Sequence, residues 1–313
     1  MKKRNISLDL LKITLAIFVV LLHSHFCDEY NETISYLTVN GIFRIAVPIF
    51  FLINGYFFSY TIENNKVIKW IIRVLILYSV WMIIYSPLWF TLNIKHNIIS
   101  LLVGYHHLWY IKAMLISGIL LFSINNKKTK NMLVLAFSLF LIGGILQYLG
   151  NYHIFKLNIL DKFTNVTYIY RNFLFLGFPF FIIGYLIKVN DWQKKINSKQ
   201  IVFLIPFSIL ILLLESYINY SYTREGVDIL FSLIIICPLI FIYALNLNMN
   251  YNVNSKNISL ISTAIYLIHP WVLKILTEIH QFGSTFLVLL TIIISFTISL
   301  IIIKINKKIK FLL

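Results

Sequence analysis

The sequence predicts an all-α fold: a polytopic transmembrane helical bundle of about ten spans, with both termini in the cytoplasm. The chain of 313 residues is 59% hydrophobic and only 12% charged, which leaves too little polar surface for a soluble protein of this size. Apolar runs of nearly twenty residues recur along it, and a run of that length crosses a bilayer as a helix. Lysine and arginine cluster in the short gaps between the runs, as topology signals do.

The apolar runs place the spans in order along the chain. We expect them near residues 7–26, 42–60, 67–90, 104–124, 131–150, 172–188, 200–219, 226–245, 258–276 and 283–303. Polar or small residues interrupt the third and the fifth, so nine or eleven spans also fit the sequence. No polar stretch is long enough to form a separate soluble domain, and we therefore expect one membrane domain over residues 1–313.

The first run follows basic residues at positions 2–4, as the core of a cleavable signal peptide does. Lys12 interrupts its apolar core, however, and the run continues past the usual length of such a core. The residues just before Cys27 are also too bulky for a cleavage site. We therefore expect a retained first helix.

The charges of the gaps alternate as the positive-inside rule requires. The gaps at 27–33 and 222–228 are acidic or mixed, whereas every second gap is basic. The basic gaps and both termini are therefore expected in the cytoplasm, and the gap at 151–171 on the external side. This placement explains the net charge of +16 without a nucleic-acid partner. The basic gaps and the tail contain Lys66 and Lys69; Lys127, Lys128 and Lys130; Lys188, Lys194, Lys195 and Lys199; and Lys304, Lys307, Lys308 and Lys310.

The first span carries three ionisable side chains on one face. Eleven helical residues turn His23 to within about 20° of the face of Lys12, and the two residues are about 16 Å apart along the axis. Asp9 lies three residues before Lys12, on the same side. Ionisable groups inside a membrane are costly and mark functional sites by default. The simpler alternative is that Lys12 reaches the cytoplasmic head groups and that His23 satisfies a contact between helices.

The ninth span has a second polar face, on which Ser262, Tyr266 and His269 lie four and three residues apart. Pro270 removes a backbone donor there and leaves a carbonyl available for a ligand or a water. A kink with a satisfied histidine explains the same pattern equally well.

Four further polar residues, three near span ends and one within a span, are candidates for binding substrate. Arg44 begins the second span and Asn54 lies deeper in it, while Arg171 opens the sixth span. Glu215 is a lone carboxylate near the outer end of the seventh span and is a possible partner of Arg44 or Arg171. Anchoring at the interface is the alternative for the two arginines.

These features together resemble the acyltransferase-3 family of integral membrane acyltransferases. That family carries a basic residue, ten intervening residues and a histidine in its first span, which Lys12 and His23 match. The resemblance covers nearly the whole chain, with the motifs in the family's order. The later segments that look like it are RIAVPIFFLINGYFF at 44–58, HLWYIKAML at 107–115, RNFLFLGFPFFIIGYLI at 171–187 and IYLIHP at 265–270.

Two positions depart from the family pattern. Lys12 stands where the family usually has arginine, so the bidentate fork for an anion is lost, and Asn54 stands where serine is frequent. The second and sixth spans are also similar to the membrane half of vancomycin-type serine racemases. We expect neither a racemase domain nor an SGNH-type domain in this chain.

The resemblance implies an enzyme that moves an acyl group, acetyl foremost, from cytoplasmic acyl-coenzyme A to a hydroxyl of a cell-surface or lipid-linked carbohydrate. It implies a multi-pass protein of the bacterial cytoplasmic membrane, with polysaccharide-synthesis proteins or a second copy as partners. No metal is expected. Succinyl as the donated group and the identity of the acceptor stay open.

The same resemblance implies roles for the polar residues. His23 would be the general base, Lys12 would hold the donor near the cytoplasmic mouth, and Asp9 would pair with Lys12. A covalent acyl-His23 intermediate is as open as direct transfer. The implied substrate-binding residues are Arg44, Asn54, Arg171, Glu215, Tyr266 and His269, with Arg44 or His269 at the developing oxyanion.

Two other functions remain compatible with the sequence. The polar face of the first span can line a pathway for a small polar solute such as serine, in a transporter without acyl chemistry. The chain can also be a structural subunit of a polysaccharide export complex, in which case changes at His23 alter neither acyl transfer nor transport.

The topology is testable with single cysteines in a background that lacks Cys27 and Cys237. We expect an impermeant thiol reagent on whole cells to label a cysteine at Asn158 and not one at Ser198, because the first lies in the predicted external gap and the second in a basic internal gap. The reverse pattern would invert the protein and remove Lys12 from the cytoplasmic side.

Overall fold

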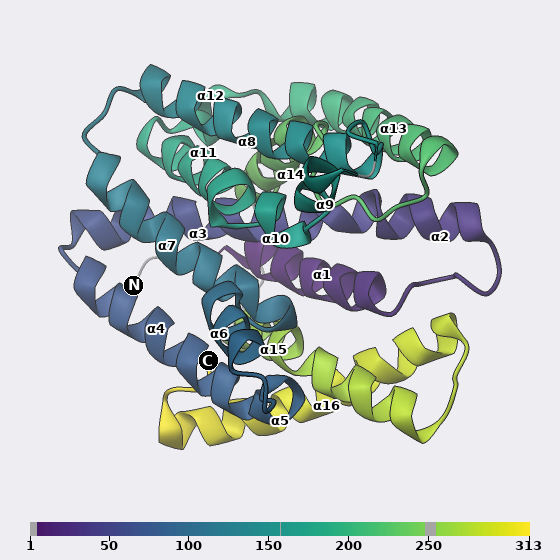
Figure 1. Ribbon diagram of the computed structural model, residues 1–313. Coiled ribbons are helices and arrows are strands. Elements are labelled where there is room, and N and C mark those ends of the chain that lie inside the picture. Colours follow the sequence, from purple (N-terminus) through teal and green to yellow (C-terminus); the bar gives the residue numbers. More distant parts are fainter. Residues whose placement is uncertain (1–4, 157, 248–254) are drawn as a thin grey trace. The chain divides into compact units, whose positions relative to one another are not determined.

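The computed structural model describes residues 5–156, 158–247 and 255–313, and all the regular structure in these residues is helical (Figure 1). Within this part of the chain, eight helical segments are long and apolar enough to cross a membrane. They are α1 (Ile6–His23); α2 (Glu32–Val39), η1 (Ile42–Ile45) and α3 (Ala46–Glu63) taken as one segment; α4 (Val67–Ile84); η2 (His106–Leu108) with α7 (Trp109–Ile124); α8 (Thr129–Asn151); α13 (Ser198–Tyr222); α15 (Lys256–Ile279); and α16 (Ser284–Ile309).

Three shorter apolar segments accompany them. They are α6 (Ile94–Val103), the π-helical turn η3 (Phe173–Gly177) with α11 (Phe178–Val189), and α14 (Leu233–Asn246). The remaining helices are single turns or little more: α5 (Ser86–Trp89), α9 (Ile159–Thr164), α10 (Thr167–Tyr170) and α12 (Trp192–Lys195).

The all-helical, multi-pass membrane fold is confirmed, and each of the ten predicted spans falls on one of these segments. The additional segment, α6, has ten residues and a length of about 15 Å, half of the hydrocarbon core of a bilayer. The count therefore lies between eight and eleven. The orientation of the termini stays a prediction, and the predicted cytoplasmic residues 1–4 and 248–254 lie outside the described part of the chain.

Two predicted boundaries were wrong for local reasons. The third span ends at Ile84 rather than residue 90, since Pro87 cannot continue the backbone ladder and starts the separate turn α5. The eighth span starts at Leu233 rather than residue 226. The preceding segment is not helical, and the backbone N–H groups of Phe231 and Ser232 bond to a side chain of α13 instead.

The described chain forms two compact units, and α3 begins in the first and continues into the second. The first unit takes residues up to Phe50, Asp191–Lys308 and Leu313; the second takes Phe51–Asn190 and Ile309–Leu312. The single membrane domain that the sequence predicts stays a prediction.

In the first unit, α1 packs along α15, and α13 packs along α14. The beginning of α1 is fixed to the end of α14: Asn5 Nδ2 donates to the carbonyl oxygen of Leu245 at 3.1 Å, and Ser7 Oγ donates to that of Leu247 at 2.8 Å. Further along, Ala16 and Val20 form a buried cluster with Ile265 of α15. These contacts fix which face of α1 meets α15.

In the second unit, α3 and α11 cross at two glycines in a reciprocal way. A Cβ on Gly55 would lie 2.0 Å from the carbonyl oxygen of Phe181, and a Cβ on Gly184 would lie 2.1 Å from that of Leu52. In each case the oxygen belongs to the residue three positions before the partner glycine. Small residues at such crossings let two backbones approach closely, which is a main source of helix association in membranes.

This crossing predicts that Gly55→Ala and Gly184→Ala each lower the stability of the purified protein. The added methyl group meets a backbone oxygen that cannot rotate away, and overpacking of this kind costs about 1–3 kcal/mol. The measurement is the thermal midpoint in detergent, followed by size-exclusion chromatography.

Gly226→Ala is the matched control, because a Cβ there finds its nearest neighbour, Asn40 Oδ1, at 3.8 Å. We expect its midpoint to match that of the parent. Equal midpoints for all three variants would mean that α3 and α11 do not cross at these glycines.

Candidate functional site

The polar face of α1 begins with a buried charge pair. Lys12 Nζ lies 3.4 Å from Asp9 Oδ1 and donates to Ser259 Oγ of α15 at 3.2 Å. The Asp9 side chain is only 3% exposed and that of Lys12 is 19% exposed. The amine is therefore held by the two helices, one carboxylate and one hydroxyl, and the predicted pairing of Asp9 with Lys12 is confirmed.

His23 is the last residue of α1. The next residue, Ser24, caps the helix by returning both its N–H and its hydroxyl to the carbonyl oxygen of Val20. His25 then leaves the helix at φ 51° and is exposed. The two histidines on either side of this cap therefore differ in exposure: His23 stays half-buried on the helix, and His25 lies outside it.

His23 meets His269 of α15. Their ring centroids are 5.2 Å apart and the rings are nearly perpendicular at 83°. His269 is fully buried and also contacts Tyr266, whose ring centroid is 6.1 Å away. The predicted polar faces of the first and ninth spans therefore lie against each other.

The backbone fixes the protonation pattern of the His269 ring. Its Nδ1 lies 2.8 Å from the carbonyl oxygen of Tyr266 and 3.2 Å from that of Ile265. Carbonyl oxygens only accept hydrogen bonds, so Nδ1 carries a proton. In the neutral ring, Nε2 is then the basic nitrogen. Both carbonyls belong to the preceding turn of α15, and Pro270 is the residue that directly follows His269.

The contacts show that α1 and α15 run in the same direction. Near the start of both helices, Lys12 contacts Ser259, and Ser262 donates to the Lys12 carbonyl oxygen at 2.7 Å. Further along both helices, His23 contacts His269. Eleven residues on one helix and ten on the other span about 16 Å and 15 Å. Parallel helices require an odd number of crossings between them, which agrees with the seven spans that the sequence places there.

Arg44 in η1 is held within the protein. Its guanidinium forms an ion pair with Asp228, donates to Asn40 Oδ1 at 2.7 Å and donates from Nε to the carbonyl oxygen of Val39 at 3.1 Å. The side chains of Arg44 and Asp228 are 13% and 11% exposed. This network ties η1 to the segment before α14.

Glu215 has a similar role at the start of α14. Its carboxylate accepts hydrogen bonds from the backbone N–H of Phe231 at 2.6 Å and of Ser232 at 2.8 Å, and from the Ser232 hydroxyl at 2.6 Å. A carboxylate at a helix start satisfies backbone donors that have no intrahelical partner. A substrate-binding role for Arg44 and Glu215 stays a prediction.

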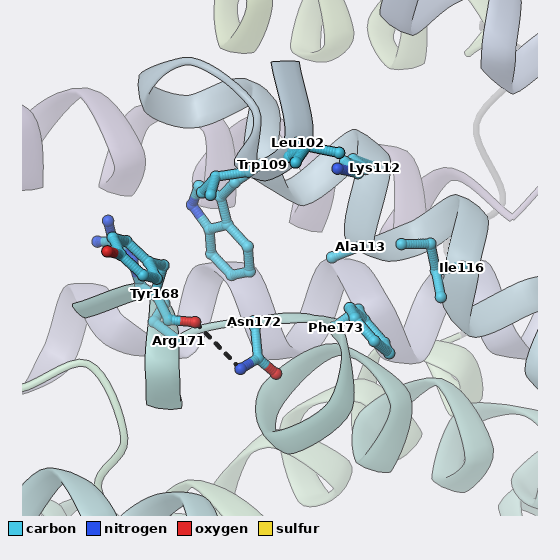
Figure 2. A pocket seen from close by; sticks show the side chains of 10 residues that line it. Leu102, Trp109, Lys112, Ala113, Ile116, Tyr168, Arg171, Asn172 and Phe173 are labelled. Carbon is cyan, nitrogen blue, oxygen red and sulfur yellow. Dashed lines mark hydrogen bonds between the residues drawn. The ribbon is translucent and has the colours of Figure 1, made fainter. Parts of the chain in front are cut away.

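Two predicted site residues, Asn54 and Arg171, belong to the second unit. Asn54 Nδ2 donates to the Tyr110 hydroxyl at 2.7 Å. The guanidinium carbon of Arg171 lies 5.5 Å from the ring centroid of Trp109, and both residues line a cavity of about 210 Å³ (Figure 2). His23 belongs to the first unit.

The structure connects three further polar residues to these sites, none of which the sequence had indicated. Ser259 bonds to Lys12, Asp228 pairs with Arg44, and Lys112 lines the same cavity as Arg171. Lys112 lies three residues into α7, so the criterion that selected Lys12, a charge inside a span, also applies to it. Ser259 and Asp228 gave no such signal.

Comparison with known proteins gives one family. A family model described as "Acyltransferase domain", of the acyltransferase-3 type, matches residues 5–304. An amino-acid racemase of Enterococcus faecalis is 26% identical over 338 residues, which is 99% of this chain and 47% of that protein. A serine/alanine racemase of Enterococcus gallinarum is 26% identical over 298 residues, 86% of this chain and 41% of that protein. The chain thus spans less than half the length of these relatives, and no solved structure matches it.

The Arg44–Asp228 pair predicts a stability effect that separates a structural role from a substrate contact. Arg44→Gln leaves the Asp228 carboxylate without its guanidinium and should lower the free energy of unfolding by about 3–5 kcal/mol. Arg224→Gln is the matched control, because its pair with Glu32 is 63% and 59% exposed and such pairs contribute about 0–1 kcal/mol. An Arg44→Gln protein as stable as the parent but inactive would instead make Arg44 a substrate contact.

Proposed function

This chain belongs to the acyltransferase-3 family, and we propose that it is a membrane-bound acyltransferase that moves an acyl group from acyl-coenzyme A to a hydroxyl of a carbohydrate. The observation that carries the proposal is the joint face of α1 and α15. It holds a charged amine at one end, a pair of histidines at the other, and about 16 Å between them.

This face suits a long, narrow donor. Acyl-coenzyme A has an anionic nucleotide at one end and a thioester at the other, joined by a thin pantetheine arm. Lys12 offers a positive charge near the start of α1, which the sequence places on the cytoplasmic side. As a point charge it binds an anion without the fixed fork of arginine. The thioester would then lie toward His23.

His23 is the proposed general base. The acceptor oxygen attacks the thioester carbonyl carbon while His23 takes the hydroxyl proton. The tetrahedral intermediate then collapses, the carbon–sulfur bond breaks, and the departing thiolate receives that proton. A well-placed general base contributes about 10²–10⁴-fold in rate, which is about 3–6 kcal/mol of barrier.

His269 is the proposed orienting partner of His23. Because its Nδ1 proton goes to backbone carbonyls, the neutral ring presents Nε2 as an acceptor toward its surroundings. An acceptor can hold the N–H of His23 and so expose the other His23 nitrogen to the hydroxyl. It suits this task better than the oxyanion role that the sequence suggested, since a neutral Nε2 has no proton to donate.

A second candidate function is transport of a small polar solute such as serine. It is favoured by the relatives, which are amino-acid and serine/alanine racemases that extend well beyond the part this chain matches. The two functions differ in a simple assay. A transferase consumes labelled acyl-coenzyme A in detergent, whereas a transporter requires sealed vesicles and leaves the thioester intact.

The transferase proposal predicts that His23→Ala lowers acyl transfer by at least about 10²-fold with no loss of folded protein, because the general base is removed. The measurement is the release of free coenzyme A thiol by purified protein with a crude cell-envelope glycan as acceptor. His25→Ala is the matched control: it removes an exposed imidazole two residues away and should retain parental turnover.

Parental turnover by the His23→Ala protein would refute the catalytic assignment. An inactive parent that nevertheless moves labelled serine into sealed vesicles would favour transport instead.

A further inference from the structure

The short helix α9 in the second unit has its polarity inverted. It lies in the connection from α8 to α10 and packs against α8 (Figure 1). Asp161 and Thr164, three residues apart, are buried against the rest of the unit. Ile159 and Phe163, four residues apart on the opposite side, are 82% and 54% exposed. A helix at a water-exposed surface turns its apolar side inward instead, so the outer face of α9 suits an apolar neighbour.

Contacts with the end of α8 hold α9 in this orientation. Asp161 Oδ2 lies 2.9 Å from Nδ1 of His153, which follows α8 directly in the chain. The Thr164 hydroxyl donates to the carbonyl oxygen of Leu160 within α9 at 3.0 Å. A Cβ on Gly150 of α8 would lie 2.7 Å from the carbonyl oxygen of Thr164, so the two backbones are in direct contact. Turning the apolar face inward would break these contacts.

The exposed side chains of this connection are apolar or cationic. Ile154 and Leu160 are also more than half exposed, and Lys156 and Lys162 are exposed next to them in the chain. Asp161 is the one acidic residue in the sequence from 151 to 171, and it is buried. An apolar face flanked by lysines is typical of segments that lie in the head-group region of a bilayer, where the amines reach the phosphates.

The segments on either side hold this face at the boundary of the membrane. The helix α8 is long and apolar enough to cross a bilayer and ends at Asn151, and the apolar segment of η3 and α11 starts at Phe173. The connection between them therefore starts and ends next to lipid. A lipid leaflet is within reach of α9 without any further partner, which favours lipid over protein as the occupant.

We propose that the outer face of α9 binds the head-group region of an anionic lipid leaflet. The side chains of Ile159 and Phe163 lie against the upper part of the acyl chains, and the amines of Lys156 and Lys162 lie at the phosphates. Each lysine near such a surface contributes about a fivefold preference for anionic over neutral lipid. The connection is thus a membrane-binding element rather than a loop in water, and this proposal does not depend on acyl transfer.

The test replaces Phe163 with the photoreactive amino acid p-benzoylphenylalanine in the full-length protein, in vesicles of equal parts phosphatidylglycerol and phosphatidylcholine. Illumination joins this side chain to C–H bonds within its reach, and mass spectrometry of the product identifies what was joined. We expect lipid products in which phosphatidylglycerol exceeds phosphatidylcholine by at least about fivefold. In a variant that also carries Lys156→Gln and Lys162→Gln, this ratio should fall toward equality.

Two controls match the probe and the charge. Phe296 lies in the middle of the apolar helix α16 and is 44% exposed, so the same photoreactive residue there should join the two lipids equally. Lys127→Gln with Lys130→Gln removes two exposed lysines at the opposite end of α8. This pair of changes should leave the lipid ratio at position 163 as in the protein with both lysines.

Several results would overturn the proposal. The absence of any lipid product at position 163 would mean that water covers α9, and a product with a second copy of the chain would mean that protein covers it. Equal products of the two lipids would remove the preference for an anionic leaflet. A ratio unchanged by Lys156→Gln and Lys162→Gln would show that these lysines do not meet the phosphates.

Discussion

A polar side chain inside a bilayer must find its partner within the protein, and this constraint accounts for most of the internal contacts described above. The amine of Lys12 meets a carboxylate and a hydroxyl, and the guanidinium of Arg44 meets Asp228. The carboxylate of Glu215 accepts hydrogen bonds from two backbone N–H groups at the start of α14, where they have no intrahelical partner. Water would satisfy such groups cheaply at a protein surface, but at membrane depth each pairing has to be built from another segment. The polar contacts therefore also determine which helices lie together.

Much of the fold followed from the sequence because length and apolarity alone identify a span. The ten predicted runs all correspond to helical segments, and the shared face of Asp9, Lys12 and His23 followed from helical periodicity. Boundaries failed where local backbone chemistry prevailed, as at Pro87. The helix α6 was missed because ten residues are too few for the span criterion.

The site was predictable in part, and the division has a physical cause. Periodicity places residues on a face of their own helix but does not say which other helix covers that face. Ser259 and Asp228 could not be chosen in advance, because a serine in a span and an aspartate in a mixed gap are ordinary until packing brings them to a lysine or an arginine. The approach of α3 to α11 was equally hidden, since Gly55 and Gly184 are informative only as a pair. Lys112 was the avoidable omission.

Because the helix between Lys12 and His23 is continuous, the number of residues between them sets both the distance and the relative direction of the two side chains. One inserted residue would turn His23 about 100° away from α15, and a full turn of four would restore the face only to move the imidazole about 6 Å past His269. Substitutions between the two residues keep this distance and direction, whereas insertions and deletions change them. The number of residues in this segment is therefore constrained independently of the packing of Ala16 and Val20 against Ile265. Other chains that retain this two-helix arrangement should keep ten residues between the cation and the histidine, even where little else in the span is alike.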